Sequence, residues 1–86
     1  MPTISQFFGI AIRLYYDDHA PPHFHVYYGE HSAKIAVETL QTLAGKLPRR
    51  ARALVLEWAA EHRDELLLNW RLAEDHQPLR AIDPLE

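Results

Sequence analysis

Most of the side chains in this sequence that could do chemistry are gathered in one short segment, residues 17–26. The segment contains Asp17, Asp18, His19, His23 and His25. Imidazoles and carboxylates are common ligands of divalent transition metals, and imidazoles also transfer protons near neutral pH. Side chains two residues apart in a β-strand point the same way, so a strand here would present the rings of His23 and His25 side by side.

A metal site is the first interpretation of this segment. His23 and His25 would supply two imidazole ligands to a zinc, iron or manganese ion, and His19 is predicted to complete the set. No candidate third ligand stands at a spacing that is diagnostic of a metal site, so the alternatives stay open. They are Asp17, Asp18 and His31.

Acid–base catalysis without a metal ion is the second interpretation. Two histidines on one strand face could act as general base and general acid, while arginine or lysine stabilises the negative charge of a phosphorane-like transition state. Such a site could cleave RNA through its own 2′-hydroxyl group. The predicted catalytic residues are Arg13, Tyr15, His23, His25 and Lys34, with Tyr27 on the same face.

A structural interpretation requires no chemistry from these residues. His19 could bond the backbone of a turn, and His23 and His25 could occupy the open, solvated face of an antiparallel sheet. Further along the chain, Trp58 and Trp70 are predicted to be core residues. All three interpretations use the same local structure, and the sequence does not choose between them.

Alternating apolar residues predict the strands that must position these side chains. From Phe8 to Tyr16 the even positions are apolar and the odd positions are smaller or polar, as in a strand with one buried face. Pro21 and Pro22 then interrupt the pattern and favour a rigid connection. Further strands are predicted over residues 23–28, 31–38 and, more briefly, 42–44.

A helical section is predicted over residues 48–75, which are rich in Ala, Leu, Arg and Glu and contain no interior glycine or proline. Its apolar residues form two stripes, which fits either a break near residues 62–64 or a continuous helix whose second stripe meets another chain in a homodimer. The break is favoured, because a single helix of this length would overhang so small a sheet. Residues 77–86, which include two prolines, are predicted to be an extended tail.

These elements predict an α+β fold in a single domain, residues 1–86. An antiparallel sheet of three to four strands would occupy the sheet section, residues 1–45. The long or bent helical region would pack on one face of that sheet. A chain of this size buries only somewhat over ~60% of its unfolded surface, so the core is expected to be thin.

Composition and charge limit the functions that this chain could have. The sequence has 9 basic and 12 acidic residues, a formal net charge of −3, which argues against a surface that is basic throughout and wraps nucleic acid. It contains no cysteine, which excludes disulfides and thiolate metal sites and is compatible with a reducing cytoplasm. No apolar run approaches the ~20 residues that span a bilayer, and the start lacks a basic signal region, so a cytoplasmic protein without membrane contact is expected.

A local basic cluster stands at the start of the predicted helical section, where the helix dipole favours acidic residues. Its members are Lys46, Arg49, Arg50 and Arg52. Basic residues in this place suggest a binding surface for a partner, either an acidic protein segment or the phosphate backbone of RNA. The alternative is a solvated helix end in which Arg50 pairs with Glu57 or Glu61.

Several motifs are spread over nearly the whole chain. They are the start Met1-Pro2-Thr3-Ile4, then Phe7-Phe8-Gly9, the segment from Asp18 to Val26 with its sequence PPHFH, the junction Gly45-Lys46-Leu47-Pro48, the stretch from Leu56 to His62, and the pair Asn69-Trp70. In these motifs the chain resembles a family of small bacterial proteins known as domain of unknown function 4160. The family has no established activity.

The resemblance implies a role in a pair of proteins. Members of that family are encoded beside another small protein, an arrangement like that of toxin–antitoxin or regulatory pairs. The chain would then act through the small protein encoded by the neighbouring gene, which would dock on the basic cluster or on the second helix stripe. The alternative is a small ribonuclease-like or metal-dependent toxin that uses His23 and His25, so the sequence leaves open whether the chain is an enzyme.

One position departs from the family pattern. Relatives commonly have a glycine in the turn after Glu38, where this sequence has Leu40. Because a left-handed backbone is costly for leucine, a reshaped or loosened hairpin is expected at this turn.

Overall fold

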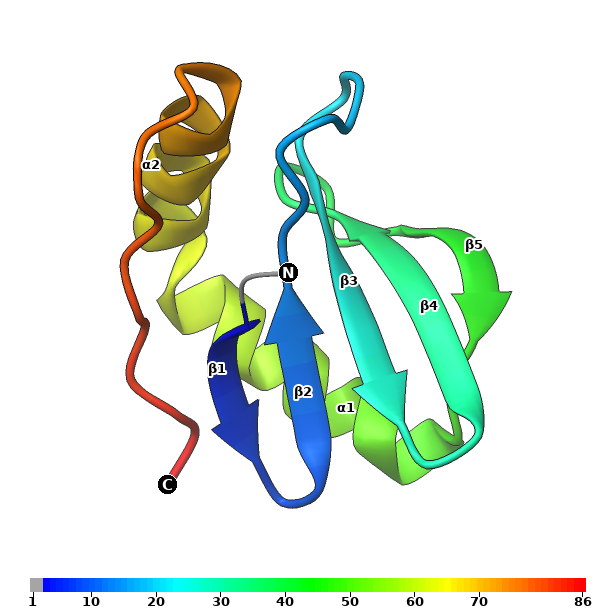
Figure 1. Cartoon of the computed structure of the whole chain (residues 1–86). Helices are drawn as coiled ribbons and strands as arrows, with labels where there is room; N and C mark the ends of the chain where they lie inside the picture. Colours follow the sequence, from blue (N-terminus) through cyan, green and yellow to red (C-terminus); the bar gives the residue numbers. More distant parts are fainter. Residues whose placement is uncertain (1–2) are drawn as a thin grey trace.

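A five-stranded antiparallel sheet followed by two helices forms the computed structural model of the chain, which describes residues 3–86 (Figure 1). The strands lie in sequence order and are β1 (Thr3–Phe7), β2 (Ile10–Arg13), β3 (His23–Tyr28), β4 (His31–Ala36) and β5 (Thr42–Lys46). The predicted α+β class is confirmed, with five strands rather than three to four. Met1 and Pro2, which begin the predicted sheet section, lie outside the described residues.

The first hairpin replaces the single strand that was predicted from Phe8 to Tyr16. Phe8 and Gly9 form a turn, both with positive φ, at 49° and 79°. The turn joins β1 to β2, and β2 ends at Arg13 rather than at Tyr16. The prediction that Phe8 points inward is therefore wrong: its side chain lies at the tip of the hairpin and is 61% exposed.

The β4–β5 hairpin forms despite the unusual residue in its turn. Leu40 takes the left-handed conformation itself, with φ of 61°, and its backbone N–H donates to the carbonyl of Ala36 at 2.9 Å. Of the two expected outcomes, a loosened hairpin is not seen, since β5 pairs with β4 from Lys46 to Thr42, whereas the pairing is irregular, as in a reshaped hairpin. This pairing shifts register once, between Lys34 and Ile35, and β5 is exposed along its whole length.

The helical section is broken, as the sequence favoured. α1 (Arg49–Glu61) and α2 (Arg63–Glu74) are separated by His62, whose φ of −119° is not helical. The break turns the apolar residues of both helices towards the same core. Neither helix has the length and apolar character that crossing a membrane would require.

One face of the sheet and the two helices enclose the core. Figure 1 shows α1 passing behind the sheet and α2 standing beside its upper end. Completely buried side chains come from both layers, and each stabilises the fold by about 1.5–3 kcal/mol relative to exposure. They include Ile12, Phe24, Val26 and Ile35 from the strands and Val55, Trp58 and Leu66 from the helices.

The predicted tail, residues 77–86, contains neither helix nor strand, but it is packed against the rest of the protein. Ile82 is only 4% exposed. Trp58 of α1 donates a hydrogen bond from its indole Nε1 to the carbonyl of Asp83 at 2.8 Å. Asn69 of α2 makes two hydrogen bonds with the backbone of Arg80, at 2.8 and 2.9 Å, so both helices hold the tail in place.

Candidate metal centre

The register of the sheet places side chains from three strands in one row. Arg13 of β2 lies opposite His25 of β3, and His25 lies opposite Lys34 of β4. Directly opposed residues in antiparallel strands point to the same face. This cross-strand row, Arg13–His25–Lys34, therefore lies on the face of the sheet that the helices leave open, because neighbouring Phe24 and Val26 point into the core.

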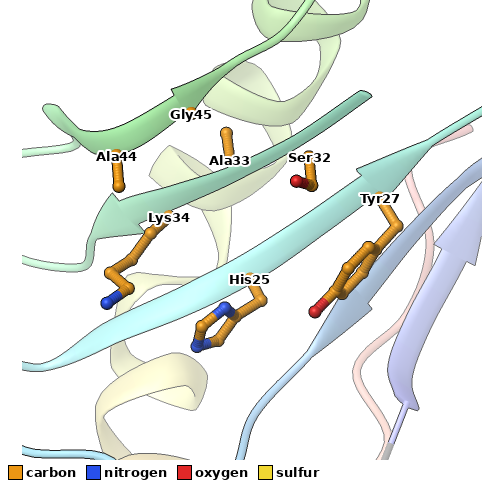
Figure 2. Close-up of a pocket in the computed structure, with 7 residues that line it drawn as sticks. All are labelled: His25, Tyr27, Ser32, Ala33, Lys34, Ala44 and Gly45. Atoms are coloured by element: carbon orange, nitrogen blue, oxygen red, sulfur yellow. The ribbon is translucent and has the colours of Figure 1, made fainter. Parts of the chain in front are cut away.

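A shallow hollow of about 150 Å³ lies beside this row. Figure 2 shows His25, Tyr27 and Lys34 extending from the sheet to the same side. Gly45 allows β5 to approach at the edge of the hollow, since a Cβ atom there would lie 2.2 Å from the carbonyl oxygen of Ser32. The open face thus offers an imidazole, a phenol and an ammonium group around one depression.

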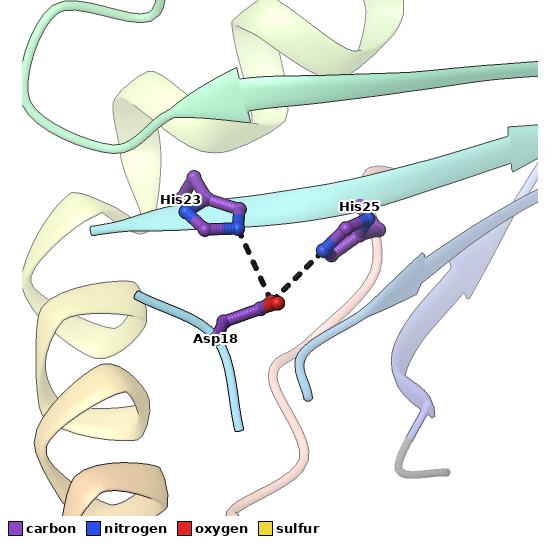
Figure 3. A group of neighbouring side chains, drawn as sticks. All are labelled: Asp18, His23 and His25. Atoms are coloured by element: carbon purple, nitrogen blue, oxygen red, sulfur yellow. Dashed lines mark hydrogen bonds and ion pairs between the residues drawn. The ribbon is translucent and has the colours of Figure 1, made fainter. Parts of the chain in front are cut away.

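Three potential metal ligands converge at the end of β3 nearest the preceding loop (Figure 3). Oδ2 of Asp18 lies 3.1 Å from Nε2 of His23 and 2.9 Å from Nε2 of His25. The three donor atoms all lie within 4.8 Å of one another. Asp18 comes from the loop between β2 and β3, so the cluster forms where that loop folds back over the strand.

The position of the proton on His23 makes this cluster unusual. Nδ1 of His23 lies 2.8 Å from the carbonyl oxygen of Pro21, which can only accept, so Nδ1 carries the hydrogen and donates it. In the neutral ring, Nε2 is then an acceptor, and it faces Oδ2 of Asp18, which is also an acceptor. His23 is 3% exposed, and within residues 3–86 its Nε2 has no hydrogen-bond partner.

Aromatic rings hold both histidines in place. The ring of His23 packs against Trp70 of α2, with 5.1 Å between centroids, and against His25 at 5.2 Å. The rings of Tyr15 and His25 meet nearly at right angles, with 4.6 Å between their centroids. The rings therefore have little freedom to turn away from Asp18, and the sequence did not point to Trp70 as a neighbour of the site because it is also a normal core residue.

Two tyrosines and an arginine continue the site along the open face. The hydroxyls of Tyr15 and Tyr27 lie 2.5 Å apart, and the guanidinium of Arg13 lies over the Tyr27 ring at 4.9 Å. The hydrogen bond that the Tyr27 hydroxyl donates to Tyr15, together with burial, raises the pKa of Tyr27 above its ordinary value. Tyr27 is therefore protonated near neutral pH and is not a base there.

The remaining residues of the predicted metal site lie elsewhere. His19 and Asp17 are exposed, and the third position beside the two histidines is taken by Asp18, which was one of the alternatives. His31 pairs with Tyr28 at the opposite end of β3, about 17 Å along the strand from His23. The hydrogen bond from Nδ1 of His23 to the carbonyl of Pro21, which fixes the ring, could not be predicted from the sequence.

The basic cluster is divided between two hollows. Lys46, Arg49 and Arg52 line one of about 440 Å³ at the start of α1. Arg50 lines a different one, beside Phe8. Within residues 3–86 none of these four side chains has an ion-pair partner, and the alternative pairing of Arg50 with glutamates of α1 is not formed.

Chemically, two imidazoles and one carboxylate suit zinc, iron or manganese, and three protein ligands leave a position for water or substrate. Comparison with known proteins adds a family but no activity. A family model described as "Domain of unknown function (DUF4160)" matches residues 9–71, a range that contains Asp18, His23 and His25. Neither the curated proteins nor the solved structures gave a match.

Proposed function

The chain belongs to the DUF4160 family, and on that premise we propose that it binds a divalent transition-metal ion through Asp18, His23 and His25 and hydrolyses a phosphate ester, with RNA as the expected substrate. The proposal combines the metal site and the ribonuclease-like function that the sequence suggested as alternatives. It replaces His19 by Asp18 as the third ligand.

The observation that carries the proposal is the buried Nε2 atom of His23. Its lone pair and a carboxylate oxygen of Asp18 lie 3.1 Å apart, without hydrogen-bond geometry between them. Two acceptors in contact inside a protein repel each other unless a proton or a cation lies between them. A metal ion satisfies both atoms at once, and Nδ1–H of His23 donating to a carbonyl is the usual arrangement of a metal-bound histidine.

The distances also suit a common ion. Nitrogen and oxygen ligands of zinc lie ~2.0–2.2 Å from the metal, so two ligands of a tetrahedral site are separated by roughly 3.3 Å. The separations of 3.1 and 2.9 Å from Asp18 to the two histidines are close to this value. Small side-chain movements would therefore be enough to admit an ion.

The surroundings suit a phosphate substrate. A divalent ion with three protein ligands supplies Lewis-acid activation of water. Arg13 and Lys34 flank His25 in the cross-strand row, and both can bind phosphate oxygens. The hydroxyls of Tyr15 and Tyr27 share one hydrogen bond, so the pair can donate one further hydrogen bond to the substrate, from the hydroxyl that accepts within the pair.

Metal content tests the first half of the proposal. Protein purified without a histidine tag and dialysed against zinc or manganese should hold about one equivalent of metal. His23→Ala should hold less than about one tenth of an equivalent, because a site with three protein ligands loses most of its metal affinity when one of them is removed. His31→Ala is the matched control, since it removes an exposed histidine from the same hairpin. Equal metal binding by wild type and His23→Ala would overturn the site.

Cleavage of a labelled single-stranded RNA tests the second half. The metal-loaded protein should cleave it, a chelator should stop the reaction, and Lys34→Ala should slow it while leaving metal content unchanged. If the loaded protein cleaves no RNA, the hydrolytic function is withdrawn while the metal site stands.

A second candidate function, action through a protein partner in a two-gene module, is supported by the unpaired cations around the larger basic hollow. Lys46, Arg49 and Arg52 gather there without an acidic partner among residues 3–86. In a pull-down with the product of the neighbouring gene, Arg49→Glu with Arg52→Glu should weaken binding, while His23→Ala with His25→Ala should not. Loss of binding only in the histidine variant would contradict this function.

A further inference from the structure

Phe8 is a strained and exposed aromatic residue at the tip of the β1–β2 hairpin. Its φ of 49° and that of the following glycine, 79°, are the positive values of a tight hairpin turn, in which Asn-Gly is the favoured pair. A bulky residue in this conformation costs roughly 1–2 kcal/mol. Because its side chain is 61% exposed, burial does not offset this cost. Strain kept without a structural benefit points to a function.

Phe8 forms one side of an apolar hollow of about 160 Å³, which we call the Phe8 hollow. Tyr28 at the end of β3 forms another side, and Ala51 and Leu54 of α1 line the rest. The lining includes one charged group, the guanidinium of Arg50. Arg50 is exposed and has no ion-pair partner within residues 3–86.

We propose that the Phe8 hollow binds a segment of a partner protein in which an apolar side chain stands next to a carboxylate. The apolar side chain enters between Phe8 and Leu54, and the carboxylate pairs with Arg50. Arginine binds carboxylates through two parallel hydrogen bonds, and aromatic and arginine side chains dominate binding energy at protein interfaces. This surface is separate from the metal centre and from the larger basic hollow, so it does not depend on the proposed function.

A second copy of the chain does not fit the Phe8 hollow as well as an acidic partner does. In a symmetric dimer the same patch meets itself, so each hollow would have to supply what the other needs. No acidic residue lines the hollow, and such a contact would bring two hollows together with both Arg50 side chains still unpaired. A foreign segment that carries a carboxylate satisfies the charge.

The partner chemistry can be tested with a displayed library of random 12-residue peptides. Peptides selected on the wild-type protein and counter-selected on Phe8→Asn should be enriched in leucine or phenylalanine beside glutamate or aspartate. Phe8→Asn is a suitable counter-target because Asn-Gly favours the same turn, so this variant should fold with equal or greater stability.

Affinities of one enriched peptide then separate the contributions of the two side chains. Phe8→Asn should raise the Kd of the peptide about tenfold or more. Arg50→Glu should abolish binding of the original peptide, and the same variant should bind a peptide in which the acidic residue is replaced by lysine. Arg71→Glu, at an exposed arginine of α2 that lines neither hollow, is the matched control and should leave Kd unchanged. Failure to enrich any peptide, enrichment without acidic residues, or a protein dimer that Phe8→Asn dissociates would each overturn the proposal.

Discussion

The two faces of β3 differ in almost every respect, although they belong to the same six residues. Phe24 and Val26 point into the core and are completely buried, whereas His25 and Tyr27 point to the open face and are partly exposed. His23 belongs to the polar side by its position but is as buried as a core residue, because Trp70 and the Asp18 loop cover it. The residues of β3 that stabilise the core therefore lie on one face and the proposed ligands on the other. Only His23, the first residue of the strand, is both buried and a proposed ligand.

The largest expected effect lies on the covered face. Phe24→Ala should lower the free energy of unfolding by about 3–5 kcal/mol, because it leaves a cavity beneath α1. His25→Ala, one residue away, should change it by less than about 1 kcal/mol while removing a metal ligand. Urea unfolding of both variants measures the difference. Similar losses in the two variants would show that the open face also stabilises the fold.

An intermediate effect is expected where the tail closes the covered side. Asn69 is 1% exposed, and both polar atoms of its side chain bond the backbone of Arg80. Asn69→Ala should cost about 1–3 kcal/mol, because it removes both hydrogen bonds that join α2 to the backbone of the tail. Thermal unfolding measures the loss of stability. Leu68→Ala, at an exposed position next to Asn69 on α2, is the control. An unchanged midpoint would mean that the tail is not needed to close the core.

The smallest effect concerns the open face and depends on pH. The hydrogen bond that Tyr27 donates to the Tyr15 hydroxyl is the main cause of the raised pKa of Tyr27, so Tyr15→Phe should lower that pKa towards its ordinary value. A raised pKa means that the folded state favours the protonated phenol. The corresponding stability is present below the ordinary pKa and is lost as pH rises through the raised one.

Absorbance of the ionised phenol, followed during a base titration, measures this shift. Tyr16→Phe is the control, because the Tyr16 hydroxyl donates to the carbonyl of Gln77, away from Tyr27. Identical titration of Tyr27 in wild type and Tyr15→Phe would contradict the assigned cause.

The strands and the helix break could be predicted where the chain keeps a regular period. Phe24 and Val26 of β3 and Ala33 and Ile35 of β4 keep the period of two on the core side. The two apolar stripes of the helical section fitted either a break or a continuous helix, and the small size of the sheet favoured the break that is found at His62. β1 could not be predicted in this way. Its pairing with β2 shifts register between Thr3 and Ser5, so Ile4 and Ser5 are buried in succession and the alternation is lost.

The candidate site could be predicted only as far as it lies on a strand. The period of two placed His23 and His25 on one face, and the register of the sheet adds Arg13 and Lys34 to it. The third ligand lies in a loop, where side-chain direction has no period, so the sequence could not choose Asp18 over its neighbour His19. Trp70, which covers His23, comes from α2. Its contact with His23 depends on how α2 packs against the sheet, and a local sequence pattern does not predict that packing.

The exposure of β5 bears on how this protein behaves at high concentration. Such an outer strand has unpaired backbone groups that could add a strand from another molecule and start aggregation. β5 is short, shifts register against β4 and ends in Lys46, all of which oppose this addition. At the other edge, the backbone N–H of Ile82 donates to the carbonyl of Ile4 at 2.8 Å, so the tail occupies part of β1. Both edge strands of the sheet thus have features that oppose the addition of a strand from another molecule.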